Sequence, residues 1–153
     1  MDSLLHVNSL AQVIQLSVAP VFLLAGVGAT LNVLANRIGR IIDRARPMEE
    51  RLAGAADSDA ARELHERLKI LARRATLINR AIALCVLSGL LVSLVVAALF
   101  VTSALQIDLA APIAVAFVMA LLSLAASLLM FLREVFIATA SLSFGGIRKS
   151  LEK

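Results

Sequence analysis

Three long stretches without a charged side chain constrain what this chain can fold into. They cover residues 16–35, 81–105 and 109–132, and none of them contains Asp, Glu, Lys or Arg. A helix needs about 20 apolar residues to cross a hydrocarbon core of about 30 Å. The chain is also 60% hydrophobic, whereas soluble domains are about one half apolar. We therefore expect an all-α membrane protein, a single membrane domain over residues 1–153 with three transmembrane helices.

The distribution of basic residues predicts the orientation of these spans. All 15 Lys and Arg residues lie between the first and second spans or after the third. Because basic residues remain on the cytoplasmic side of a membrane, we expect residues 37–80 and the C-terminal tail, 133–153, in the cytoplasm and the N-terminus outside. Basic residues beside membrane spans act as topology and lipid signals, so we expect anionic lipid and no nucleic acid as a partner.

Apolar residues continue at spacings of three and four beyond the first span and ahead of the second, at Ile38, Ile42 and Ala45 and at Leu64, Leu68, Leu71, Ala75 and Ile78. This periodicity predicts that spans one and two extend into a cytoplasmic helical hairpin over residues 37–80. We expect Pro47 to stop or kink the outgoing helix. Residues 53–56 should form the turn, and Asp57 or Ser58 should cap a returning helix that runs to residue 105. After the third span, Gly145–Gly146 should end the last helix.

Two rows of small residues predict helix-packing faces. The second span carries Ala81, Cys85, Gly89, Ser93 and Ala97, each four residues after the last, and the first span carries Ala25, Gly28 and Ala29. Helices in lipid gain little from burying apolar surface against each other, so small residues that let backbones approach are a main route to tight packing. The alternative is a chance enrichment of small residues. The partner could be another span of the chain or another copy of it.

Polar side chains in and beside the first span have two interpretations each. Asn32 and Asn36, with Asn79 at a similar depth on the second span, could join helices by amide hydrogen bonds or form a polar ring around the axis of an oligomer. Gln12 and Gln15 could line the mouth of a water-filled path or belong to an ordinary interfacial turn.

The basic residues nearest the membrane form a third group, Arg37, Arg40, Arg44, Arg73, Arg74 and Arg80. Three roles are open to them. They could solvate the hairpin and pair with its glutamates, bind anionic lipid, or line an anion-attracting vestibule in a ring of subunits.

Motifs for catalysis are weak. His65–Glu66 opens a zinc-protease pattern, but Lys69 occupies the position of the second histidine. Cys85 has no base near it in the sequence, and the three spans hold no carboxylate. We therefore expect no enzyme activity, no metal and no cofactor.

Several segments resemble the bacterial family catalogued as domain of unknown function 2721. They are residues 17–24 (SVAPVFLL), 31–34 (LNVL), 36–37 (NR), 40–46 (RIIDRAR), 78–82 (INRAI) and 131–134 (FLRE). The resemblance implies a three-span protein of the bacterial inner membrane and carries no activity with it.

Two function hypotheses follow. The first is a homo-oligomeric, channel-like assembly for ions or small solutes, with the first span near its axis. The second is a non-conducting membrane scaffold whose basic cytoplasmic hairpin binds a partner protein or anionic lipid.

Overall fold

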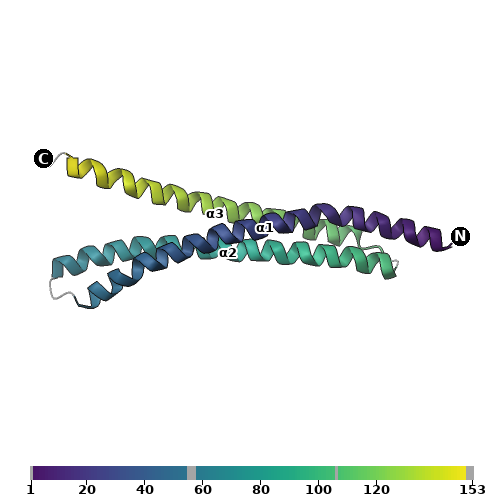
Figure 1. Cartoon of the computed structure of the whole chain (residues 1–153), viewed down its shortest axis with the longest axis horizontal. Helices are drawn as coiled ribbons and strands as arrows, with labels where there is room; N and C mark the ends of the chain where they lie inside the picture. The colour runs from purple at the N-terminus through teal and green to yellow at the C-terminus, as the bar shows by residue number, and fades with distance from the viewer. Residues whose placement is uncertain (1, 55–57, 106, 151–153) are drawn as a thin grey trace. The chain divides into compact units, whose positions relative to one another are not determined.

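The chain is built from three long α-helices. The structure, a computed structural model, describes the backbone of residues 2–54, 58–105 and 107–150 and the side chains of residues 14–54, 59–105 and 107–138. Helix α1 spans Asp2–Ala53, α2 spans Ser58–Leu105 and α3 spans Ala110–Ser150 (Figure 1). The expected all-α class is confirmed.

Each helix contains a segment long and apolar enough to cross a membrane. These segments fall within Ile14–Ala53, Asp59–Leu105 and Ala110–Ala138. They include the first two uncharged windows of the sequence and all but the first residue of the third, and the window lengths of about 20 residues or more match a bilayer core. The chain is therefore a multi-pass membrane protein with three candidate spans.

The helix ends agree with the sequence analysis in part. Helix α2 begins at Ser58 and ends at Leu105, as predicted, whereas Asp57 and residues 55–56 of the predicted turn lie outside the described residues. Of the two outcomes predicted for Pro47, a stop is wrong, because α1 continues through it to Ala53, and a kink stays a prediction. The flanking residues, among them Glu49, Glu50 and Leu52, are good helix formers that offset the cost of one proline.

The end of α3 also differs from its prediction. We expected Gly145–Gly146 to end this helix, but α3 continues through both glycines to Ser150. A glycine inside a helix costs about 1 kcal/mol relative to alanine, which weakens a helix without necessarily ending it.

Buried residues recur at spacings of three and four along each helix. They are Ser17, Pro20, Val27, Leu34 and Ile41 on α1, Ile78, Ala81, Cys85, Ser88, Val92 and Val95 on α2, and Ala120, Ser123, Ser127 and Glu134 on α3. An average spacing of 3.5 keeps one side of a helix against a neighbour over many turns. Packing within one chain therefore uses one heptad-like row on each helix.

The predicted small-residue row on α2 coincides with this buried row at one end only. Ala81 and Cys85 are buried and Gly89 is half-buried, but Ser93 and Ala97 are exposed. A helix turns about 100° per residue, so each step of four residues adds about 40° beyond a full turn. Residues spaced by four therefore move gradually around the surface of α2. The contact with a neighbouring helix stays on one side of α2, which spacings of three and four define.

The helices contribute to two compact units, which we describe separately. Unit 1 consists of the residues up to Asn32 together with Ala83–Ala126, and unit 2 consists of Val33–Ile82 together with the residues from Ser127 onward. Three uncharged contacts join helices in unit 1. The Cys85 thiol donates to the carbonyl of Val27 (3.7 Å) and the Ser88 hydroxyl donates to the carbonyl of Ala120 (2.8 Å). A Cβ at Gly89 would lie 3.3 Å from Cγ1 of Val27, so this glycine permits close approach of α1 and α2.

In unit 2, the helices are joined by a hydroxyl contact like that of unit 1 and by an ion network. The Ser127 hydroxyl of α3 donates to the carbonyl of Ala81 on α2 (2.7 Å). Seven residues further along α3, about two helical turns, the buried position is occupied by the carboxylate of Glu134. A serine can use a backbone carbonyl as its partner, but a buried carboxylate requires donors of opposite charge.

Candidate functional site: an arginine-lined cavity

Glu134 is the buried charged residue among the side chains of unit 2 that the structure describes. Its side chain has 0% of its surface exposed, and it follows the uncharged window of α3, which ends at residue 132. It lies seven residues after Ser127 and fourteen after Ala120, on the buried row of α3. The helical period therefore turns this carboxylate inward, toward α1 and α2.

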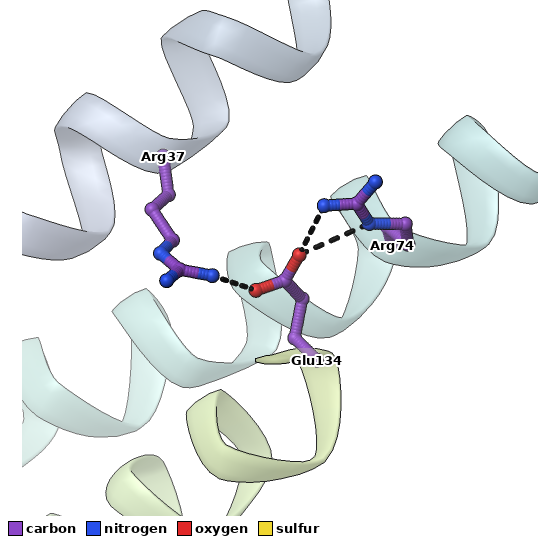
Figure 2. A network of polar contacts seen from close by, with 3 residues as sticks. All are labelled: Arg37, Arg74 and Glu134. Carbon is purple, nitrogen blue, oxygen red and sulfur yellow. Dashed lines mark hydrogen bonds and ion pairs between the residues drawn. The ribbon is translucent and has the colours of Figure 1, made fainter. Parts of the chain in front are cut away.

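Two arginines from two other helices hold this carboxylate. Nη1 of Arg37, on α1, donates to Oε2 of Glu134 (2.8 Å). Nε and Nη2 of Arg74, on α2, donate to Oε1 at 3.0 and 2.8 Å. Figure 2 shows the two guanidinium groups approaching the carboxylate from different helices, so that one side chain of α3 is bonded to both α1 and α2.

The arginines differ in their surroundings. The Arg37 side chain is 30% exposed and that of Arg74 is 15% exposed. The guanidinium of Arg37 also lies over the ring of Phe131, 4.9 Å from its centroid, in a cation–π contact. Phe131 precedes Glu134 by one helical turn on α3, so both residues orient the same arginine.

These charges line a cavity. The cavity measures about 200 Å³, and its walls are formed by Arg37, Arg40, Ile41, Arg44, Arg74 and Glu134. The four residues from α1 follow spacings of three, one and three, which places them on one side of that helix. Four guanidinium groups and one carboxylate give the walls a net formal charge of +3.

The arginines fall into two pairs by their partners. Arg37 and Arg74 share Glu134, whereas Arg40 and Arg44 form no ion pair among the side chains that the structure describes. Both of the latter are exposed. The cavity thus combines a fixed pair of cations with a second pair that has no ion-pair partner among the described side chains, and such an arrangement attracts anions.

The ion pairs give the site its geometry more than its stability. Moving a carboxylate out of water is costly, and the attraction of its partners often does no more than offset that cost. Bonds to charged donors are, however, directional and short. The network therefore fixes the position of α3 relative to α1 and α2 within unit 2.

The remaining predicted residues lie elsewhere. Arg73 and Arg80 are exposed and do not line the cavity, because they are rotated on α2 by about 100° and 240° from Arg74. Asn36 and Asn79 in unit 2 are exposed in a single chain.

In unit 1, Gln15 and Asn32 are exposed in a single chain, as are the three small residues of the first span, Ala25, Gly28 and Ala29. The side chain of Gln12 lies outside the described residues. In the described part of the chain, no group of His, Cys, Asp and Glu side chains could hold a metal ion.

Glu134 was not among the site residues predicted from the sequence. The three predicted spans contain no carboxylate, and the residues after 132 were predicted to form a tail. A signal was available, since Glu134 continues the row of Ala120 and Ser127 at steps of seven residues. A charge on the apolar row of a helix, in a chain with many arginines at the same membrane boundary, predicts a buried ion pair.

Comparison with known proteins gives one result. The family model described as Protein of unknown function (DUF2721) matches residues 17–144, a range that includes the cavity residues, the second and third uncharged windows and all but the first residue of the first window. Neither the curated proteins nor the solved structures give a match. Because the matched range covers most of the 153 residues, the resemblance seen in the sequence is confirmed, and the chain belongs to the DUF2721 family of proteins of unknown function.

Proposed function

We propose that this protein is a non-conducting scaffold of the bacterial inner membrane that binds anionic lipid headgroups through the basic surface of unit 2. The observation that supports the proposal is the cavity with four arginines and one carboxylate. Arg37 and Glu134 each lie two residues beyond an uncharged window. That is the depth at which lipid headgroups meet a spanning helix, and each basic residue there contributes about 1 kcal/mol to binding of anionic lipid.

The orientation in this proposal follows the positive-inside rule. Residues 37–80 and 133–153 are cytoplasmic, and the N-terminus is outside. The part of α1 from Asn36 to Ala53 is then about 27 Å long, at 1.5 Å per residue, and forms a cytoplasmic helical hairpin with the first part of α2. The arginine-lined cavity is at the base of this hairpin, where the inner leaflet carries its negative charge.

The interior of a single chain favours a scaffold over a pore. Apart from Glu134, the buried polar residues in the described part of the chain are serines, at positions 17, 88, 123 and 127. Ser17, Ser88 and Ser127 donate to backbone carbonyls, so they serve helix geometry and packing. A water-filled path would therefore have to run between copies of the chain.

A homo-oligomeric channel is the second candidate, and one observation favours it. Asn32 and Asn36 are exposed on α1, about 140° and 180° around the helix from buried Val27. A second copy packed on this side would bring amide side chains and small residues into the contact, both of which are common between membrane helices. The same side carries Gly28, which leaves room for a close approach.

A lipid-binding experiment tests the scaffold. The full chain is extracted into detergent with an equimolar mixture of phosphatidylglycerol and phosphatidylcholine, and the retained lipid is identified by native mass spectrometry. We expect preferential retention of phosphatidylglycerol, lost on replacing Arg37, Arg40 and Arg44 by Gln. Equal retention of the two lipids by the unaltered protein would contradict the proposal.

A flux experiment separates the two candidates. Protein reconstituted in liposomes is expected to give no potassium or chloride flux above that of empty vesicles. Flux that disappears in an Asn32→Leu, Asn36→Leu variant, while the oligomer persists, would instead establish the channel.

A further inference from the structure

We propose that the cavity in unit 2 binds one phosphate group carrying two negative charges, as in a phosphate monoester or inorganic phosphate. The inference deepens the proposed function, on which it rests for the site, and it specifies the ligand. Phosphatidylglycerol is a phosphodiester with a single charge. A monoester carries about −1.5 to −2 at neutral pH, since its second proton leaves near pH 6.

The charge of the cavity favours the dianion. With Glu134 in place, the walls retain a net formal charge of +3. A diester reduces that charge by one, whereas a monoester reduces it by about two and offers three terminal oxygens to the guanidinium groups. Arg37 and Arg74 are partly buried, so their attraction for the second negative charge is screened less than it would be at an open surface.

The space in the cavity suits a phosphate group. Its volume of about 200 Å³ is well above the roughly 10–15 Å³ of accessible volume that one water molecule needs. A phosphate with a few waters fills this space. The rest of a lipid, or of a soluble ester, would remain outside the cavity.

The donors divide into two sets. Arg40 and Arg44 lie four residues apart on α1, on one side of that helix, and form no ion pair among the described side chains. Their two planar groups can each bind two phosphate oxygens, which lysine could not do. They supply the principal contacts.

Arg37 and Arg74 supply the second set. Their three hydrogen bonds to Glu134 use three of the ten N–H groups that two guanidiniums carry. Glu134 is thus a positioning residue. It fixes the directions of two arginines, so that donors not used by the carboxylate can serve a ligand, and it reduces the mutual repulsion of the four cations.

Binding measurements on the full chain in phosphatidylcholine nanodiscs test the proposal. In one arm, inorganic phosphate is titrated and followed by calorimetry. In the other arm, phosphatidic acid, a lipid monoester, is compared with phosphatidylglycerol by native mass spectrometry. We expect saturable binding of one monoester per chain, at least about tenfold tighter than binding of the diester, a ratio that corresponds to about 1.4 kcal/mol.

A matched pair of double variants tests the site. Arg40→Gln with Arg44→Gln removes two cavity arginines, whereas Arg46→Gln with Arg51→Gln removes the same charge from exposed positions of α1 that do not line the cavity. Because hydrogen bonds between charged groups are stronger than those between neutral groups, loss of both arginines should weaken binding by at least about tenfold. The control should change it less than about twofold, because Arg46 and Arg51 do not line the cavity and so cannot donate hydrogen bonds to a ligand in it. Thermal unfolding checks that both variants fold.

The outcomes are distinct. Tight binding of phosphatidic acid without binding of inorganic phosphate assigns a lipid headgroup as the ligand, and binding of both assigns a site that also takes soluble phosphate. Equal weakening by the two double variants, or equal affinity for monoester and diester, overturns this inference. If phosphatidylglycerol is still retained over phosphatidylcholine, the proposed function stands without this inference. If that preference is lost as well, the proposed function and the inference are both wrong.

Discussion

The two units of this molecule join the same three helices by different chemistry. In unit 1, the helices meet through a glycine and through thiol and hydroxyl groups that donate to backbone carbonyls. In unit 2, one such hydroxyl contact is followed by a buried carboxylate with two arginines. Uncharged groups can be satisfied in lipid without water, but a charged group needs partners and nearby solvent. This change in chemistry along α3 is the one expected where a helix leaves the hydrocarbon core.

Removal of the buried charge should have the largest effect. We expect Glu134→Ala to lower the free energy of unfolding by about 3 kcal/mol, because loss of one partner leaves the others partly buried without compensation. Both arginines retain some contact with solvent, which keeps the loss at the lower end of the range for buried pairs. Unfolding of the purified chain by SDS or heat in detergent measures it.

An exposed ion pair provides the control. Glu63 accepts a hydrogen bond from Arg67 at 2.6 Å, and their side chains are 67% and 61% exposed. Glu63→Ala should change the unfolding free energy by less than about 0.5 kcal/mol. Similar losses for the two glutamates would show that burial of Glu134 does not determine the stability of unit 2.

A large side chain at Gly89 should have the next largest effect, this time in unit 1. A Cβ at this position would lie 3.3 Å from Val27 and 3.8 Å from Leu24. We expect Gly89→Leu to cost about 1–3 kcal/mol through overpacking. The same unfolding measurement applies.

Gly28 is the matched control, since a Cβ there would meet no atom within 4 Å in a single chain. Gly28→Leu should leave the unfolding of a single chain nearly unchanged and should reduce the oligomeric fraction in size-exclusion chromatography with light scattering. If the oligomer is unaffected, the side of α1 that carries Gly28 is not the contact between copies.

Hydroxyl contacts between helices should have the smallest effect and should be similar in the two units. Ser88→Ala in unit 1 and Ser127→Ala in unit 2 are each expected to cost about 0.6–1 kcal/mol, the usual range for such bonds between membrane helices. Ser93 donates to Gly89 within its own helix and is exposed, so Ser93→Ala should cost less than either. A much larger loss for Ser127 than for Ser88 would show that the ion network depends on the hydroxyl contact beside it.

The positions of the three candidate spans followed closely from local pattern, whereas the ends of α1 and α3 did not. The uncharged windows located the three candidate spans, and the spacing of apolar residues located α2 from Ser58 to Leu105. The errors concerned Pro47 and Gly145–Gly146, which were given too much weight as helix breakers. A proline or glycine adds a fixed local cost, and whether a helix continues depends on what its neighbours contribute.

The residues of the candidate site were predicted only in part from the sequence. Arg37, Arg40, Arg44 and Arg74 were among six arginines selected for their density near the membrane, but nothing in that density separated them from Arg73 and Arg80. The separation depends on the direction of each side chain around its helix. Glu134, which bonds to two of these arginines, was not predicted. It lies beyond the apolar window of α3, although it continues the same helical row.

The sequence alone determined the solvent of this protein and the number of its helices, because hydropathy and helical period are properties of neighbouring residues in the chain. Only the tertiary structure decided which carboxylate meets which arginines. That pairing requires α1, α2 and α3 to have one rotation and one register in unit 2, so that residues 37, 74 and 134 converge. Rotation and register are fixed by packing between helices that are distant in the sequence, and no local pattern encodes them.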